Sequence, residues 1–146
     1  MRKKTFALRF LSVNVLLTTG LGLLLSACTT APEYSSLLDQ AAKEINVECP
    51  IMVDNETRLD SVATAPNLTF IYYYSLIYMD KVNVNIEELK GYLKPNILDN
   101  AQYNEALQDF RQNKVSMVYR YADMEGSFLF EINVKPDDYL EEADNG

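Results

Sequence analysis

The chain has 146 residues, of which 21 are acidic and 13 basic, and its formal charge at pH 7 is −8. This length suits one domain with a modest core, and the negative charge argues against nucleic acid or an anionic lipid surface as a partner. The sequence contains no histidine, which excludes the usual Ser-His-Asp, Cys-His and histidine–metal sites. Because it also lacks a phosphate loop, a nucleophile elbow and a dinucleotide fingerprint, we expect no cofactor and no metal.

Residues 1–27 have the features of a secretory signal peptide. Residues 2–4 are basic, an apolar stretch follows, and small side chains stand just before Cys28. The run Leu25-Ser26-Ala27-Cys28 resembles the lipobox of bacterial lipoproteins. This resemblance implies that the chain is cut before Cys28 and that the Cys28 sulfur is acylated. The membrane is then one partner of the mature protein.

A retained transmembrane helix is the alternative interpretation of this segment. Residues 5–27 are long enough for it, since a bilayer takes about 20 apolar residues. Arg9, Asn14 and two glycines interrupt the apolar run, however, and the run ends in a small-small-Cys pattern. We therefore favour the lipoprotein. Thr29 stands where the aspartate that retains lipoproteins at the inner membrane of enteric bacteria would be, which implies the outer membrane, facing the periplasm, in a host with two membranes.

Cleavage would change the charge and leave one free thiol. Residues 28–146 carry nine basic and 21 acidic side chains, a net charge of −12, which leaves room for a basic protein partner or a cation. With Cys28 acylated, Cys49 has no intramolecular partner for a disulfide. Its apolar neighbours predict a buried structural thiol.

The first folded element is expected shortly after the anchor. Residues 28–35 show no periodicity and predict a short tether that carries the lipidated cysteine. Ser36 and Asp39 then give a capping-box-like start. Apolar residues at helical spacing predict a helix at about 36–46.

Three strands are expected next. The apolar run 51–53 and the alternating residues 57–63 predict two short strands after Pro50. Residues 68–79 predict the clearest strand, since apolar side chains occupy most positions on both of its faces. A strand with two apolar faces is typically central in a sheet.

The second half predicts helices and then a hairpin. Asn85 followed by Glu88 gives another cap signature, and an apolar stripe at helical spacing follows it. Pro95 is expected to break or kink this helix. In residues 115–121 and 128–134, the side chains expected on the two faces of a strand alternate with period two. A Gly-containing turn separates the two runs, which predicts a β-hairpin.

These elements predict an α+β domain over residues 36–136. In this domain a small antiparallel sheet carries helices packed on one face, and the last two strands form the C-terminal β-hairpin. Residues 137–146, with five acidic side chains, predict a frayed tail.

The chain has ten tyrosines, an unusual number that concentrates on the predicted strands. Tyrosine combines a large apolar ring with a polar tip, which suits interfaces as well as cores. On the strand 68–79 we interpret Tyr72 and Tyr74 as core residues and keep Tyr73 as the possible partner-binding residue. The acidic turns at 54–56 and 123–125 do not match a calcium loop, so we expect no metal there.

A resemblance to known proteins extends over about residues 40–140. The run 50–54, the run 56–60, the tyrosine-rich strand and the hairpin that ends in Ile132-Asn133-Val134 resemble a group of small secreted bacterial proteins. The resemblance implies a shared fold and export, and it brings no catalytic residue.

The favoured function is a membrane-tethered binding or assembly protein of the cell envelope without catalytic activity. Its partners would be the membrane, through acylated Cys28, and a protein of the envelope, but not nucleic acid. A secretion pilotin and an inhibitor of an envelope enzyme are both compatible with this prediction. The alternatives are a carrier of a small apolar ligand and, with less support, an enzyme that uses carboxylates.

Overall fold

The computed structural model describes residues 31–140. The predicted signal peptide, Cys28 and the end of the acidic tail lie outside the described residues. Within residues 31–140, no helix is both long and apolar enough to cross a membrane.

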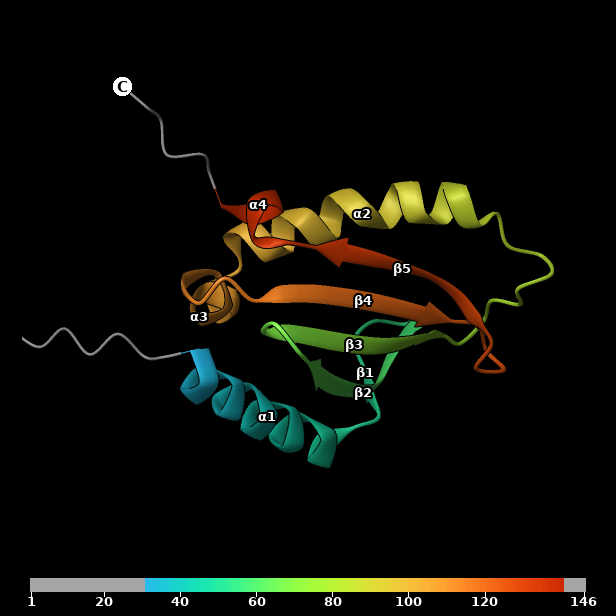
Figure 1. The fold of residues 1–146 in the computed structure, drawn as a ribbon. Helices are drawn as coiled ribbons and strands as arrows, with labels where there is room; N and C mark the ends of the chain where they lie inside the picture. Colours follow the sequence, from blue (N-terminus) through green and yellow to red (C-terminus); the bar gives the residue numbers. More distant parts are fainter. Residues whose placement is uncertain (1–30, 141–146) are drawn as a thin grey trace, which may run out of the picture.

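One five-stranded sheet forms the centre of the described domain (Figure 1). Its strands follow the order β1-β2-β3-β4-β5. Neighbouring strands are antiparallel except β3 and β4, which are parallel. The strands are β1 (Ile51–Met52), β2 (Thr57–Ala65), β3 (Thr69–Leu76), β4 (Ser116–Ala122) and β5 (Phe128–Val134).

The structure confirms the predicted α+β class, the central strand and the C-terminal β4–β5 hairpin. The parallel β3/β4 pair differs from the fully antiparallel sheet that was expected. A parallel pair needs a long crossover connection, and the helical segment between β3 and β4 supplies it. This segment contains α2 (Ile86–Tyr103), the 3-10 helix η1 (Glu105–Leu107) and α3 (Gln108–Gln112).

The two long helices pack on the same face of the sheet, as predicted. Leu38 of α1 (Ala31–Glu48) packs in one cluster with Phe70 of β3, and Ile97 of α2 packs in another with Met117 of β4. Phe70 and Met117 are register partners on adjacent parallel strands, so their side chains share a face. Figure 1 shows α1 along the β2 side of the sheet and α2 along the β5 side.

Two helices differ from their predicted bounds. The helix α1 begins at Ala31, five residues before the expected start at 36, so most of the predicted tether is helical. The helix α2 continues through Pro95, so the helix does not break there, which was one of the two expected outcomes. Pro95 lies on the exposed side of α2, and Leu93 and Ile97 on either side of it pack against the core. These apolar contacts hold the helix together where one backbone hydrogen bond is missing.

The start of the predicted tail belongs to the fold. The short helix α4 (Pro136–Tyr139) follows β5 and buries Tyr139, whose exposed fraction is 2%. Its hydroxyl donates a 2.8 Å hydrogen bond to the backbone carbonyl of Val115.

Cys49, which was expected to be buried, is partly exposed at the end of α1.

Candidate functional site

Four tyrosines stack across the middle of the helix-covered face, and we call them the tyrosine ladder. They are Tyr72 and Tyr74 of β3 and Tyr119 and Tyr121 of β4. The parallel register places Tyr72 beside Tyr119 and Tyr74 beside Tyr121, with ring centroids 5.0 and 5.3 Å apart. The rings of each pair are inclined by only 19° and 21°. Because the ring faces contact one another, the ladder offers ring edges and hydroxyls, not ring faces, to the space above the sheet.

The ladder phenols stay neutral over a wide pH range. Burial raises the pKa of Tyr119 and of Tyr121 to about 12. Burial also raises the pKa of Tyr72 and of Tyr74, and the neighbouring ladder phenols add to both shifts. At neutral pH these side chains can therefore act as uncharged hydrogen-bond donors and acceptors, but not as bases.

A cavity of about 210 Å³ lies above the ladder, between α2 and the turn that joins β1 to β2. Tyr74 and the two β4 tyrosines of the ladder form its floor. Leu93 and Asn96 line it from α2, and Asp54 lines it from the turn. We call it the ladder cavity. It combines an apolar floor with amide and phenol groups, the usual composition of a small binding site.

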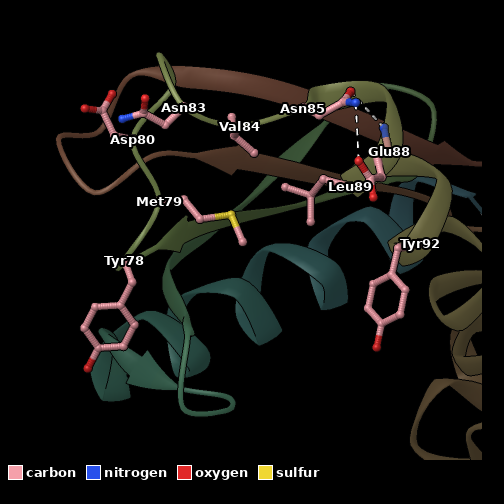
Figure 2. A pocket seen from close by; sticks show the side chains of 9 residues that line it. All are labelled: Tyr78, Met79, Asp80, Asn83, Val84, Asn85, Glu88, Leu89 and Tyr92. Atoms are coloured by element: carbon pink, nitrogen blue, oxygen red, sulfur yellow. Dashed lines mark hydrogen bonds between the residues drawn. The ribbon is translucent and has the colours of Figure 1, made fainter.

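A larger cavity, of about 520 Å³, lies at the beginning of α2 (Figure 2), and we call it the end cavity. Met79, Val84 and Leu89 supply its apolar lining. Tyr78 and Tyr92 stand on either side of these residues in Figure 2, and 74% and 72% of their surfaces are exposed. The polar lining residues are Asp80, Asn83, Asn85 and Glu88.

The two cavities follow one another along one side of α2. Leu89 and Tyr92 line the end cavity, and Leu93 and Asn96 line the ladder cavity. Residues three and four apart on a helix are surface neighbours, so these four side chains form a continuous row. We call the two cavities together the α2 groove.

Hydrogen bonds at the start of α2 shape the end cavity. The Asn85 side chain accepts a 3.3 Å hydrogen bond from the backbone N–H of Glu88, and its amide donates one of 3.3 Å to the Glu88 carboxylate (Figure 2). This is the cap that the sequence predicts. On the other side, the backbone N–H of Met124 in the hairpin turn donates to the carbonyl of Met79. The loop between β3 and α2 is thus tied to both elements.

Tyr73, the predicted partner-binding residue, lies on the opposite face of the sheet and is separate from the α2 groove. It is half-buried beside a cavity of about 270 Å³ that Asp60, Arg120 and Phe128 also line. The Arg120 guanidinium lies 4.6 Å from the centre of the Phe128 ring and 3.8 Å from the Glu131 carboxylate. Figure 1 and the two core clusters leave this face without a helix in the described part of the chain.

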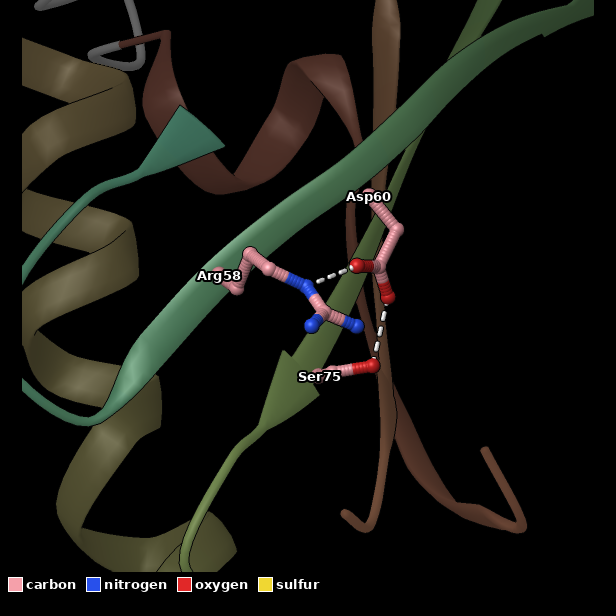
Figure 3. A network of polar contacts seen from close by, with 3 residues as sticks. All are labelled: Arg58, Asp60 and Ser75. Atoms are coloured by element: carbon pink, nitrogen blue, oxygen red, sulfur yellow. Dashed lines mark hydrogen bonds and ion pairs between the residues drawn. The ribbon is translucent and has the colours of Figure 1, made fainter. Parts of the chain in front are cut away.

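A polar network on the same face satisfies a buried hydroxyl (Figure 3). The Ser75 side chain, only 4% exposed as a residue, donates to one oxygen of Asp60, and the Arg58 guanidinium donates to the other. Both carboxylate oxygens of Asp60 are therefore engaged by neighbours. This environment suits a structural role for Asp60 better than a role as a general acid or base.

The acidic turns use their aspartates as internal acceptors. Asp54 accepts hydrogen bonds from the backbone N–H groups of Glu56 and Thr57, and these bonds hold the pKa of Asp54 below its ordinary value. Asp123 accepts from the N–H groups of Glu125 and Ser127 in the same way. Within residues 31–140, no three His, Cys, Asp or Glu side chains are grouped so as to hold a metal ion.

Tyr78 and Tyr92 are the residues that the sequence did not identify. In the sequence, Tyr78 continues the alternation of residues 68–79, and Tyr92 falls in the apolar stripe after Asn85, so the local pattern does not mark either residue as exposed. The strand ends at Leu76, and Tyr78 leaves the sheet for the loop. No local pattern reveals this exit, because it depends on how the loop packs against α2.

The fold and the groove define a class: an α+β domain with one sheet layer, one helix layer and an aromatic groove along the second long helix. Residues 34–130 match the model of a domain of unknown function, DUF8479, and the chain belongs to this family. No curated protein matches the sequence.

Three solved structures have a similar fold. A predicted secreted protein from Pseudomonas aeruginosa aligns over 74% of this chain and 94% of its own, with a TM-score of 0.62 and 13% identity. The type 2 secretion pilotin EpsS from Vibrio vulnificus aligns over 76% and 96%, with a TM-score of 0.58 and 7% identity. The type II secretion pilotin AspS from Vibrio cholerae aligns over 73% and 93%, with a TM-score of 0.56 and 12% identity. At these identities the likeness concerns the fold alone.

Proposed function

We propose that this chain is a lipid-anchored, non-catalytic assembly protein of the cell envelope, of the pilotin type, which binds a segment of a protein partner in the α2 groove. The observation that carries the proposal is the groove itself: an open, aromatic surface on a fold shared with two type II secretion pilotins. Large exposed aromatic surfaces on a small domain mark interaction sites.

The position of the predicted anchor supports this function. Cys28 stands three residues before the start of α1 at Ala31. An acylated Cys28 would therefore hold the domain close to the membrane, at the end where α1 begins. Figure 1 shows the loop of the end cavity at the opposite end of the domain. Anchoring raises the local concentration of a binding surface, so even a weak contact becomes effective.

A carrier of a small apolar ligand has less support. Exposed tyrosines line the end cavity, and the ladder tyrosines that floor the other cavity are packed against one another. A ligand carrier would enclose most of its ligand, whereas the α2 groove runs along the surface of a helix. A carboxylate-dependent enzyme has less support again, because Asp54, Asp60 and Asp123 accept hydrogen bonds within the fold.

The test is made in the organism that encodes the chain. The gene is deleted and restored as wild type or as Cys28→Ala, and the channel protein of the type II secretion system is followed by membrane fractionation. We expect the channel to be lost from the outer membrane after deletion and restored only by the wild type. Normal channel assembly in the deletion strain, or a host without such a system, would contradict the pilotin function.

A further inference from the structure

The end cavity combines an apolar base with two separate sources of negative potential. Met79 and Leu89 point toward each other across its base (Figure 2). Figure 2 shows the carboxylates of Asp80 and Glu88 at opposite ends of the cavity, and among the described residues no lysine or arginine lines it. The faces of tyrosine rings also attract cations.

Both carboxylates retain free acceptor capacity. The Asp80 side chain accepts one hydrogen bond, of 3.0 Å, from the Val82 backbone N–H. The Glu88 side chain accepts one of 3.3 Å from Asn85. An ionised carboxylate offers about four acceptor positions. This distinguishes the pair from Asp123, whose oxygens accept three backbone N–H groups.

The partial positive charge at the start of a helix would by itself favour an anion. In α2, side chains of the first turn already offset this charge. Asn85 accepts the Glu88 N–H, and Glu87 and Glu88 place two negative charges in that turn. The chain as a whole is also acidic. The charge of the cavity therefore complements a cation.

We infer that the end cavity is the docking point for a basic segment of the protein partner, in which a leucine-like side chain enters the base and a lysine or arginine on either side of it approaches one of the two carboxylates. The inference rests on the proposed function and specifies the chemistry of the partner. The long stem of lysine or arginine can cover apolar surface while its charged end remains near water. Tyr78 and Tyr92 provide such surface, since they flank the base and are largely exposed.

The test uses the full-length protein in a non-ionic detergent and two short probes, acetyl-Leu-Lys-Leu-Lys-amide and its neutral counterpart with glutamine in place of lysine. Binding is followed by NMR titration of the backbone amides. We expect the lysine probe to shift the resonances of residues 78–92 and to bind about fivefold more tightly than the neutral probe, in line with a cation–aromatic contact at an exposed site.

Matched variants locate the contact. Glu88→Gln keeps the capping geometry and removes the charge in the cavity, while Glu87→Gln removes the same charge one residue away, outside the lining. Tyr92→Ala removes a cavity wall, while Tyr103→Ala removes a similarly exposed tyrosine of α2 outside it. We expect Glu88→Gln and Tyr92→Ala each to weaken the lysine probe about fivefold, and both controls to leave it unchanged.

Three results would overturn the inference: equal binding of the neutral probe, equal weakening by Glu87→Gln, or resonance shifts outside residues 78–92. The result is independent of the cellular test. The probes could bind the cavity selectively by charge while the deletion strain assembles the channel normally. This combination would refute the pilotin function and would still support the inferred binding chemistry of the end cavity.

Discussion

The carboxylate of Asp123, in the turn between β4 and β5, accepts a hydrogen bond from the backbone N–H of Lys81, 42 residues earlier in the chain. It also accepts from the N–H groups of Glu125 and Ser127, at 3.0 and 2.8 Å. Burial acts to raise the pKa of Asp123, but these hydrogen bonds outweigh it and hold the pKa below its ordinary value. One side chain thus connects the hairpin turn to the loop of the end cavity.

Asp123→Asn should therefore destabilise the domain and loosen the loop of residues 77–85. Because the pKa of Asp123 is lowered in the folded state, its contribution is present above about pH 4, the unfolded value, and is lost as the pH falls below it. Urea unfolding at pH 7 and pH 3 measures the free energy of unfolding of both proteins. The difference between wild type and variant should be smaller at pH 3 than at pH 7. Glu125→Gln, an exposed change in the same turn, is the control. An equal difference in the free energy of unfolding at both pH values would show that the ionised carboxylate of Asp123 is not the source of the stabilisation.

Tyr139→Phe tests whether the fold includes α4. The change leaves the Val115 carbonyl without the 2.8 Å hydrogen bond in a buried position. An unsatisfied buried acceptor costs about 1–3 kcal/mol, so the free energy of unfolding should fall by that amount in urea titration. Tyr103→Phe removes an exposed hydroxyl on α2 and should change stability by less than about 0.5 kcal/mol. Equal stability of the two variants would mean that the hydrogen bond between Tyr139 and Val115 adds nothing to the stability of the fold.

The sequence predicts the elements well where the pattern is local. The cap at Asn85 and the period-two alternation on both sides of Gly126 depend on neighbouring residues, and both features are present in the structure. The start of α1 and the folding of Tyr139 depend on partners far along the chain. Tyr139 reaches Val115, and Tyr34 in the first turns of α1 packs with the same residue in one cluster. Periodicity within a short window carries no information on such contacts.

In the candidate site, too, the sequence predicts the features that depend on neighbouring residues and misses those that depend on distant contacts. The sequence marks the tyrosine-rich strand, but it does not reveal that β3 and β4 pair in parallel and bring Tyr72 beside Tyr119. Nor does it reveal the end cavity, whose walls come from a loop and a helix that meet only in the fold. Tyr73, the residue singled out from the sequence, lies on the other face.

Tyr72→Phe should make stability less sensitive to alkaline pH. The folded pKa of Tyr72 is raised by burial and by the phenols of Tyr119 and Tyr74, so its stabilising contribution is complete below pH 10 and is lost as the pH rises toward the folded value. Between pH 8 and pH 11 the wild type should lose about 1 kcal/mol more than the variant. Urea unfolding at both pH values measures this difference. Equal losses would show that Tyr72 ionises as freely in the fold as in the unfolded chain.

Cys28→Ala should abolish lipid labelling and block cleavage before residue 28. The basis is the Leu25-Ser26-Ala27-Cys28 run behind a basic start. Labelling cells with a clickable fatty acid, followed by mass spectrometry of the purified protein, measures both effects. Cys49→Ala, at the other cysteine, is the control and should be labelled and cut normally. A Cys28→Ala protein that is still labelled and has the normal mature mass would contradict the predicted anchor.

Tyr73 and Tyr74 are neighbours in β3 that point to opposite faces, and together they separate a core role from a surface role. Tyr74 packs against both core clusters and stacks on Tyr72 and Tyr121, so Tyr74→Ala should cost about 3–5 kcal/mol, the range for aromatic truncation in cores. Tyr73 belongs to neither cluster, and Tyr73→Ala should cost less than about 1 kcal/mol.

Urea unfolding of both alanine variants measures these costs, and Tyr74→Phe serves as a conservative control that keeps the stacked ring. If Tyr73→Ala is nearly neutral for stability, any loss of partner binding in that variant must come from the helix-free face. That result would identify a second contact surface beside Arg120 and Phe128, away from the α2 groove. If instead Tyr73→Ala unfolds the domain as severely as Tyr74→Ala, both faces of β3 are essential to the fold. The partner-binding role predicted for Tyr73 would then have to be abandoned, and the α2 groove would remain the site to test.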